Sequence, residues 1–243
     1  MSIDKDHSII SRSVEASGCR IHVRVEGQGE PLLLINGLTR PLGSWFPFAD
    51  AMTGRRIVSF DAPGVGESAN SLLPLSIAQL AAICVAVLDE LGLERVDVLG
   101  FSLGGAVAQE LAGTYPTRVR RLVLAATSCG IGSTLAGWDM RDGVAVVVNG
   151  LVRANPVATI WRVMAFAAWS SIPYLGSIEA PTLVVCGSED RVAPIANSRF
   201  RSSTPAPLPL HQGKTARETL CSSISNTQSR SSGPERVSLS EIH

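Results

Sequence analysis

The sequence predicts an α/β fold with a mostly parallel central sheet and helices on both faces. Short, mainly apolar segments such as 31–35 and 121–126 have the length and composition of strands that are buried on both faces. They alternate with longer segments such as 76–91, whose apolar residues recur at helical spacing. The chain has 243 residues, of which 45% are hydrophobic and 17% charged, and this suffices for the core of one sizeable domain.

Four strands and one helix are expected before residue 76. Segments 9–15 and 19–26 alternate loosely between apolar and polar residues around an Ala-Ser-Gly turn, which predicts a hairpin at the edge of the sheet. Segments 31–35 and 56–60 predict buried strands, and each ends in a loop rich in turn-forming residues. Segment 45–52 is the helix candidate between them.

The clearest helix covers residues 76–91. Its apolar residues share one face, Ser76 and Gln79 are placed to form a capping box, and Gly92 follows its end. The remaining elements expected are strands at 96–101, 121–126 and 182–186 and a helix that follows Ser102 and ends at about Tyr115.

A serine stands where strand 96–101 meets the next helix. Gly100-Phe101-Ser102-Leu103-Gly104 fits the G-x-S-x-G pattern of a nucleophile elbow, in which residues two before and two after the serine must be small to avoid collision. The Ser102 hydroxyl then projects above the strand, and the first helix amides remain free to stabilise an oxyanion. The alternative is a glycine-rich turn that merely holds a serine. A phosphate loop is excluded, because no lysine follows Gly105.

The expected core consists of residues 1–127 and 181–200. Within it, Asn36-Gly37, Asp61 and Ser102 all follow parallel strands, so they converge at the edge where such sheets bind ligands. In residues 128–180 the alternation stops, and we expect a short, largely helical lid insertion. Its apolar residues either pack as ordinary core or line a pocket for an acyl group.

Residues 201–243 form an atypical tail. They contain ten serines, four prolines, no aromatic residue and ten apolar residues in 43, so we expect the tail to be mostly disordered. Pro205, Pro207 and Pro209 make 204–211 a poor strand. We therefore expect the last strand and helix of the fold to be missing or replaced, and a change of reading frame near Phe200 is one hypothesis for this break.

Composition excludes several kinds of partner. The 21 basic and 21 acidic residues balance, so nothing favours nucleic acid or an anionic membrane. Five widely spaced cysteines indicate reduced thiols rather than disulfides or a metal site, and no cofactor is expected. Residues 1–8 are polar and resemble no signal peptide, and no apolar run is long enough to span a membrane. These features predict a cytoplasmic protein.

Four motifs in this order resemble the α/β-hydrolase superfamily: Asn36-Gly37, Asp61-x-Pro63-Gly64-x-Gly66-x-Ser68, the elbow at Ser102, and Gly187-x-x-Asp190. The resemblance covers about residues 31–200 and implies the α/β-hydrolase fold. A narrower resemblance to intracellular poly(3-hydroxyalkanoate) depolymerases and related esterases depends on these segments: Asn36-Gly37-Leu38, Trp45-Phe46-Pro47-Phe48, Asp61-Ala62-Pro63-Gly64-Val65-Gly66, Leu122-Val123-Leu124-Ala125-Ala126-Thr127 and Trp169-Ser170-Ser171-Ile172.

The resemblance also implies roles for individual residues. Ser102 is the nucleophile, Asp190 is the acid that orients a histidine, and the backbone amides of Leu38 and Leu103 form the oxyanion hole. Glu189 competes with Asp190 for the acid's role. The residues expected to support the elbow and its loops are Gly37, Gly100, Gly104 and Asp61.

The catalytic histidine departs from the family pattern. The family places it after the last strand, near Arg217 in this chain, but the nearest internal histidine is His211; His7, His22 and His243 are placed worse. The leading prediction is a serine hydrolase that cleaves a hydroxyalkanoate or related acyl ester, small or polymeric, through an acyl-enzyme on Ser102. An acyltransferase or a cofactor-free haloperoxidase is the enzymatic alternative. The other alternative is a catalytically impaired relative that binds a small apolar ligand or a partner.

Overall fold

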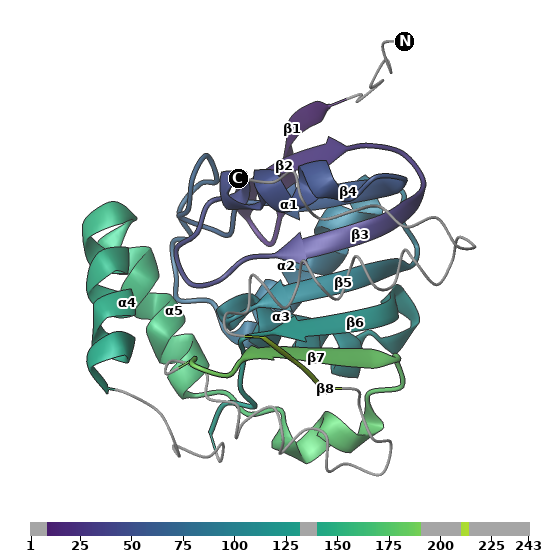
Figure 1. Ribbon diagram of the computed structural model, residues 1–243. Coiled ribbons are helices and arrows are strands. Elements are labelled where there is room, and N and C mark those ends of the chain that lie inside the picture. The colour runs from purple at the N-terminus through teal and green to yellow at the C-terminus, as the bar shows by residue number, and fades with distance from the viewer. Residues whose placement is uncertain (1–8, 132–139, 191–209, 214–243) are drawn as a thin grey trace, which may run out of the picture.

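One sheet of eight strands runs through the molecule, in the order β1-β2-β4-β3-β5-β6-β7-β8 (Figure 1). The computed structural model describes residues 9–131, 140–190 and 210–213. The strands are β1 (Ile10–Ala16), β2 (Cys19–Glu26), β3 (Glu30–Ile35), β4 (Arg55–Phe60), β5 (Val96–Phe101), β6 (Val119–Ala125), β7 (Thr182–Gly187) and β8 (Leu210–Gly213).

The antiparallel part of the sheet is confined to one edge. Strands β1 and β2 form the expected hairpin, joined by Ser17 and Gly18, which both have positive φ as a tight hairpin turn requires. Strand β2 pairs antiparallel with β4, and all remaining neighbours pair in parallel. The mostly parallel sheet predicted from the sequence is therefore confirmed, and the carboxyl ends of six strands meet at one edge.

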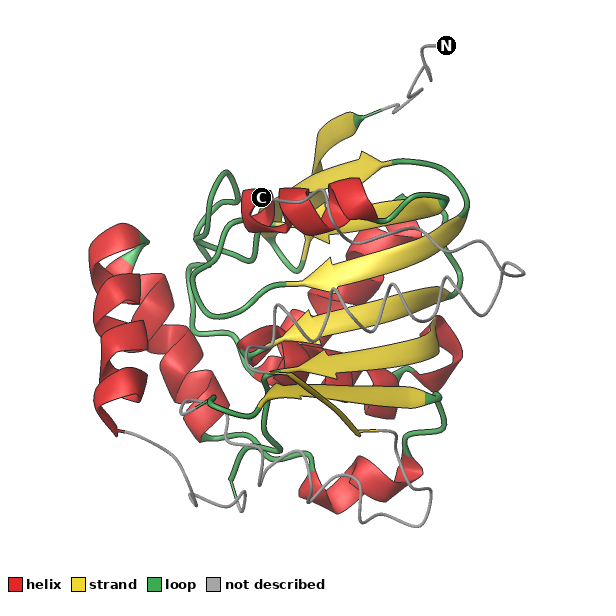
Figure 2. Cartoon of the chain, viewed as in Figure 1, coloured by secondary structure: helices red, strands yellow, loops and turns green. Residues whose placement is uncertain are grey.

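Helices cover both faces of this sheet (Figure 2). They are α1 (Phe46–Ala51), α2 (Ile77–Glu90), α3 (Leu103–Thr114), α4 (Met140–Arg153) and α5 (Pro156–Ala167), with short 3-10 turns η1 (Leu42–Trp45), η2 (Pro116–Arg118) and η3 (Ile172–Ser177). Helix α2 has the expected capping box: the Ser76 side chain accepts from the Gln79 amide, and the Gln79 side chain accepts from the Ser76 amide.

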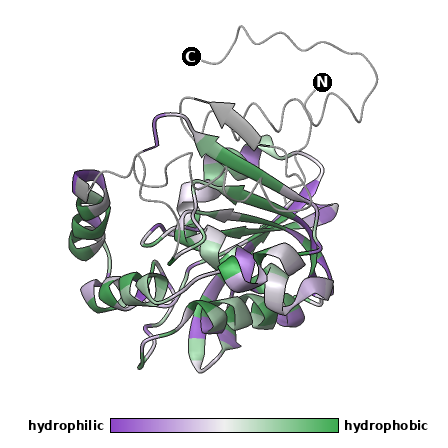
Figure 3. Ribbon diagram, turned by 90° about the horizontal axis from the view of Figure 1, so that it is seen from below, coloured by the Kyte–Doolittle hydropathy of each residue, from purple (hydrophilic) through white to green (hydrophobic). Residues whose placement is uncertain are grey.

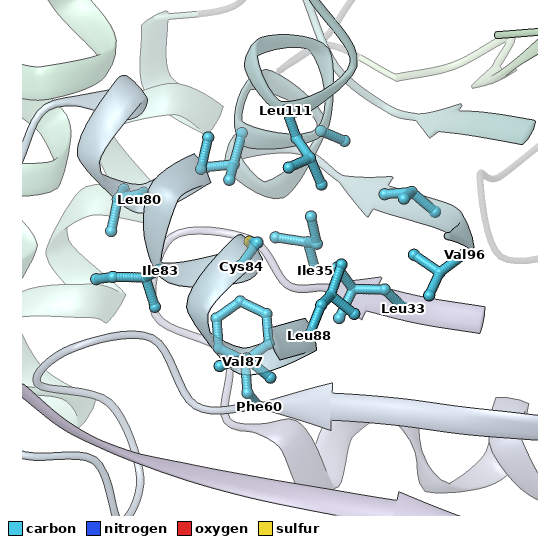
Figure 4. Close-up of a cluster of buried hydrophobic side chains, with 14 of the residues drawn as sticks. Leu33, Ile35, Phe60, Leu80, Ile83, Cys84, Val87, Leu88, Val96 and Leu111 are labelled. Carbon is cyan, nitrogen blue, oxygen red and sulfur yellow. The ribbon is translucent and has the colours of Figure 1, made fainter. Parts of the chain in front are cut away.

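Strand β3 shows why its sequence is continuously apolar. Leu33 and Ile35 pack with α2 and α3 in the larger core cluster, part of which Figure 4 shows. Leu32 and Leu34 face the other way and pack with Trp45 and Ala49 on the α1 side. Because successive side chains of a strand point to opposite faces, burial on both faces removes the polar positions. The central strands are accordingly coloured as hydrophobic in Figure 3.

The segment between β6 and β7 contains α4, α5 and η3, in keeping with a largely helical insertion. Helices α4 and α5 stand beside the edge where the parallel strands end (Figure 1). None of the helices within the described ranges combines the length and the apolar character that a membrane crossing requires.

At the C-terminal edge of the sheet, where the last strand was expected to be missing or replaced, the structure has one short strand from the tail. Four residues, Leu210–Gly213, pair in parallel with β7 from Val184 to Gly187. The three closely spaced prolines all precede Leu210, so each residue of β8 retains its backbone N–H for the ladder. Leu210 and His211 thus begin a short strand, and the rest of 204–211 lies outside the described residues. The other tail residues, Phe200 and the expected last helix lie outside the described residues.

Candidate active site

Ser102 occupies the turn between β5 and α3 in an unusual backbone conformation. Its φ is 53° and its ψ is −118°, values that cost a residue with a side chain about 1–3 kcal/mol. Three hydrogen bonds hold it there: its amide donates to the Ala125 carbonyl (2.9 Å), and its carbonyl accepts from the Gly105 amide (2.9 Å) and the Thr127 hydroxyl (2.8 Å). The surrounding backbone and the Thr127 side chain thus enforce the strained turn.

The flanking glycines are required by close contacts across this turn. A Cβ at Gly100 would lie 2.7 Å from the Ala108 Cβ, and one at Gly104 would lie 2.5 Å from the Asn36 carbonyl oxygen. Real Cβ atoms do not approach other atoms this closely, so a larger residue forces the backbone to shift. The structure therefore shows why the G-x-S-x-G pattern needs small residues at positions 100 and 104.

Ser102 is half-exposed, and its hydroxyl makes no capping hydrogen bond to α3. Helix α3 begins at Leu103, whose amide belongs to the first turn and has no intrahelical acceptor. The loop after β3 passes beside the serine, since a Cβ at Gly37 would lie 3.4 Å from the Ser102 Cβ. A hydroxyl, a helix N-terminus and a second loop therefore meet at one point, which is the arrangement that stabilises an oxyanion.

This meeting point lies where the strand order of the sheet reverses. Strand β3 lies between β4 and β5. The connection from β3 to β4 and the connection from β4 to β5 therefore run in opposite directions across the sheet. Open α/β sheets bind ligands at such a switch point, outside the carboxyl ends of the strands. The loops after β3 and β5 carry Leu38 and Ser102 there.

The loop after β3 is held by its own side chains. Asn36 donates from Nδ2 to the Pro41 carbonyl (2.9 Å) and to the Ser44 hydroxyl (3.0 Å), and Ser44 donates to Pro41 as well (2.8 Å). The side chain of Asn36 thus fixes the loop.

Asp61 follows β4 and is 2% exposed. Its carboxylate accepts hydrogen bonds from the amides of Leu42 (2.7 Å) and Glu67 (3.0 Å), and its own carbonyl accepts from the Ser68 hydroxyl (2.7 Å). Both carboxylate oxygens are therefore engaged by the backbone of neighbouring loops, and the residue organises the turn.

The turn after β7 carries the two competing acids. The Asp190 amide donates to the Gly187 carbonyl (3.3 Å), and the Asp190 side chain is half-buried while that of Glu189 is exposed. Strand β6 lies between β5 and β7, and the Ala126 amide at its end donates to the Val185 carbonyl (2.9 Å). Asp190 therefore lies at the same edge of the sheet as Ser102, and β6 separates the two strands that lead to them.

Of the histidines, the structure describes His22 and the backbone of His211, and these lie on opposite sides of β5 in the strand order. His22 lies on β2, which β4 and β3 separate from β5, and its ring contacts Ser11 and Glu67. The backbone of His211 lies within β8, opposite Val185, so its strand neighbours the strand that leads to Asp190. His7, His243 and the side chain of His211 lie outside the described residues.

Two residues that sequence analysis did not assign also contribute to the site. Thr127, which is 4% exposed, holds the Ser102 carbonyl. Arg162 of α5, also 4% exposed, donates from Nη1 to the Leu38 carbonyl and from Nη2 to the Pro63 carbonyl. Burial lowers the pKa of Arg162 to about 10. In the sequence, Arg162 is marked only as the single arginine of an otherwise apolar helical segment.

The described residues offer no cluster of three or more metal-ligating side chains. Cys84, in α2, is fully buried, and burial raises the pKa of its thiol to about 12. The described part of the site is thus built from backbone amides, a hydroxyl and carboxylates.

Comparison with known proteins identifies the family. A family model described as alpha/beta hydrolase fold matches residues 30–142. The chain is 32% identical over 202 residues to the poly(3-hydroxyalkanoate) depolymerase of Ectopseudomonas oleovorans, covering 70% of this chain and 71% of the relative. It is 30% identical over 198 residues to a pimeloyl acyl-carrier-protein methyl ester esterase of Nitrosomonas europaea, covering 79% and 70%.

A solved structure agrees with these relatives. The crystal structure of a hydrolase from Pseudomonas aeruginosa PA01 matches with a TM-score of 0.71 and 26% identity, over 94% of this chain and 98% of that one. The sheet order, the elbow at Ser102 and these likenesses lead to one conclusion: the chain belongs to the α/β-hydrolase superfamily.

Proposed function

We propose that this protein is a serine hydrolase that cleaves a carboxylic ester through an acyl-enzyme on Ser102. The observation that carries the proposal is the strained Ser102 backbone, which presents a half-exposed hydroxyl beside the first amide of α3 and the loop after β3. Strain of this kind persists only where the surrounding structure enforces it, and it is common at catalytic nucleophiles.

The chemistry follows from these groups. The Ser102 oxygen attacks the ester carbonyl carbon while its proton passes to a histidine base, and the resulting oxyanion accepts hydrogen bonds from the Leu38 and Leu103 amides. The carbon–oxygen bond to the alcohol then breaks, and the alcohol takes the proton from the histidine. Water, deprotonated by the same base, attacks the acyl-enzyme, and the carboxylic acid leaves as the Ser102 hydroxyl is restored.

The proposed base is His211 and the proposed acid is Asp190. Strand β8 is parallel to β7 and pairs His211 with Val185 and Gly213 with Gly187, so the histidine lies on the strand next to β7, and the turn after β7 carries Asp190. Among the remaining histidines, His22 contacts Glu67 and Ser11 on the opposite side of the strand order.

The proposed substrate is a hydroxyalkanoate or a related acyl ester. Two relatives that match most of this chain are named as a poly(3-hydroxyalkanoate) depolymerase and as a methyl ester esterase, and both names denote cleavage of an ester bond. The likeness supports ester chemistry, and the length of the acyl chain is left to substrate profiling.

A fluorophosphonate probe followed by intact-mass measurement tests the proposal directly. We expect one adduct and measurable hydrolysis of short 4-nitrophenyl esters, and we expect Ser102→Ala to abolish both without changing the circular dichroism spectrum. Ser128→Ala is the matched control, because Ser128 is also half-buried at this edge of the sheet. Hydrolysis that survives in Ser102→Ala would refute the nucleophile.

A second candidate function is favoured by the position of His211 inside β8 rather than in a loop after it. A base held within a strand has less freedom to reach the serine, and the protein would then be a catalytically impaired relative that binds a small apolar ligand or a partner. His211→Ala separates the two. Loss of turnover by several orders of magnitude, with His22→Ala unaffected, supports the hydrolase. Slow turnover that neither variant changes supports the second candidate.

A further inference from the structure

Arg162 connects three parts of the structure from a buried position. It projects from α5, and its two terminal nitrogens donate to carbonyls of different loops, Leu38 after β3 and Pro63 after β4. These acceptors lie 124 and 99 residues away in the sequence. A planar guanidinium presents its donors in a rigid fork, so it can hold two carbonyls at once where an ammonium acts as a single point charge.

The charge of Arg162 has an unusual set of partners. The salt bridges found for arginines among the described residues involve Arg24, Arg55, Arg118 and Arg120, whereas the partners found for Arg162 there are backbone carbonyls. Burying a cation is unfavourable unless it is well solvated by polar groups. A buried arginine here therefore costs more free energy than a neutral donor would. This cost indicates that the fork of two donors, rather than the charge, is the useful feature of Arg162.

The same two loops are also packed tightly against α4 and α5. A Cβ at Gly150 of α4 would lie 2.7 Å from the Thr39 methyl carbon, and a Cβ at Gly64 would lie 2.6 Å from the Ala158 Cβ of α5. The helical pair thus approaches both loops closely, and Arg162 provides the hydrogen bonds across this contact. Leu38 is the residue whose amide is the proposed second oxyanion donor.

We propose that Arg162 is a positioning residue for the oxyanion hole: by holding the Leu38 carbonyl, it fixes the Leu38 amide toward Ser102 and makes the hole depend on the seating of α4 and α5. The inference rests on the proposed function, because it concerns the same site. The inference adds that turnover depends on Arg162 of α5, a residue that does not contact the reacting atoms.

Arg162→Lys is the first test, because lysine retains the charge and an apolar stem but cannot reach both carbonyls with a fork. Removal of one oxyanion donor lowers kcat about 10²–10³-fold, and partial misplacement lowers it less. We expect kcat, normalised to active sites titrated with the fluorophosphonate, to fall about 10- to 100-fold, with KM nearly unchanged. Affinity for an alkylboronic acid, whose adduct on the serine places an oxygen in the hole, falls in parallel.

Arg118→Lys is the matched control. Arg118 also donates to two backbone carbonyls, those of Glu94 (2.7 Å) and Leu93 (3.0 Å), but these precede the amino end of β5, at the opposite edge of the sheet. A purely structural role for Arg162 would lower the melting temperature and the titratable fraction in the way the control does, while leaving kcat per titrated site and boronic acid affinity unchanged. That result would overturn the inference.

Gly150→Ala is a second variant that leaves Arg162 in place. The added methyl group would lie 2.7 Å from the Thr39 methyl carbon and 3.0 Å from the Thr159 methyl carbon of α5, so these groups must shift. We expect kcat per titrated site to fall about 2- to 10-fold, again at unchanged KM. If Arg162→Lys does not fold, this variant decides: wild-type kcat would overturn the inference. Failure of the proposed function is recognised separately, because hydrolysis would then survive in Ser102→Ala.

Discussion

A methyl group at position 104 tests the elbow and the neighbouring loop together. Gly104 lies in the first turn of α3, where the helix passes directly under the end of β3. In Gly104→Ala the new Cβ would lie 2.5 Å from the Asn36 carbonyl oxygen and 2.6 Å from the Ile35 carbonyl carbon. Both atoms belong to the backbone, so no side chain can rotate to make room.

The size of the effect follows from these distances. Ordinary van der Waals contact begins at 3.4 Å, and the Ile35 carbonyl oxygen lies closer to the new Cβ than either of these atoms, so α3 and the end of β3 must separate by more than about 1 Å. Overpacking of this kind costs about 1–3 kcal/mol, which lowers the Tm of a domain of this size by about 2–12 °C. The same displacement moves the loop that carries Leu38, and a 1 Å error in a catalytic group costs about 10²-fold in rate.

The assay combines thermal unfolding with ester turnover per titrated site. Gly176→Ala is the control, because Gly176 is exposed and a Cβ there would have no atom within 4 Å. We expect the control to melt and turn over like the wild type. If Gly104→Ala did the same, the close approach of α3 to β3 and the reasoning built on it would be wrong.

Three further predictions concern single groups. Asp190→Asn should reduce kcat by several orders of magnitude and Glu189→Gln only slightly, measured by ester turnover, since the proposed acid must orient the base. Thr127→Val should lower the free energy of unfolding in urea by about 1 kcal/mol, because the Ser102 carbonyl loses one donor. Burial raises the pKa of Cys84 to about 12, so as the pH rises the thiol ionises in the unfolded protein before it ionises in the folded protein. The free energy of unfolding should therefore fall by about 1.4 kcal/mol per pH unit above about pH 9 in the wild type but not in Cys84→Ala. The comparison in urea runs from about pH 8 to 10, because the lowered pKa of Arg162, about 10, acts with the opposite sign above that range. Equal slopes in the two proteins would contradict the Cys84 assignment.

The fold was predictable because its signals are local. Apolar runs of strand length, the capping box at Ser76 and Gln79, and small residues around Ser102 each depend on neighbours within a few positions of the sequence. The expected helix 76–91 accordingly matches α2, Ile77–Glu90, to within one residue at each end.

The contacts that sequence analysis missed are those between distant segments. Arg162 meets carbonyls 124 and 99 residues away, and Thr127 meets a carbonyl 25 residues away, so no periodicity or spacing marks them. Strand β8 was missed for a different reason. Its four residues follow a run of prolines, and the pairing with β7 outweighs the weak strand signal of so short a segment.

The distance between the proposed nucleophile and the proposed acid is set by β6. The Ser102 amide donates to Ala125 on one side of this strand, and the Ala126 amide donates to Val185 on the other. Two interstrand spacings, together about 10 Å, therefore separate the ends of β5 and β7, and a base that serves both groups must lie above β6. Because main-chain hydrogen bonds join β6 to both neighbours, this spacing does not depend on which side chains β6 carries.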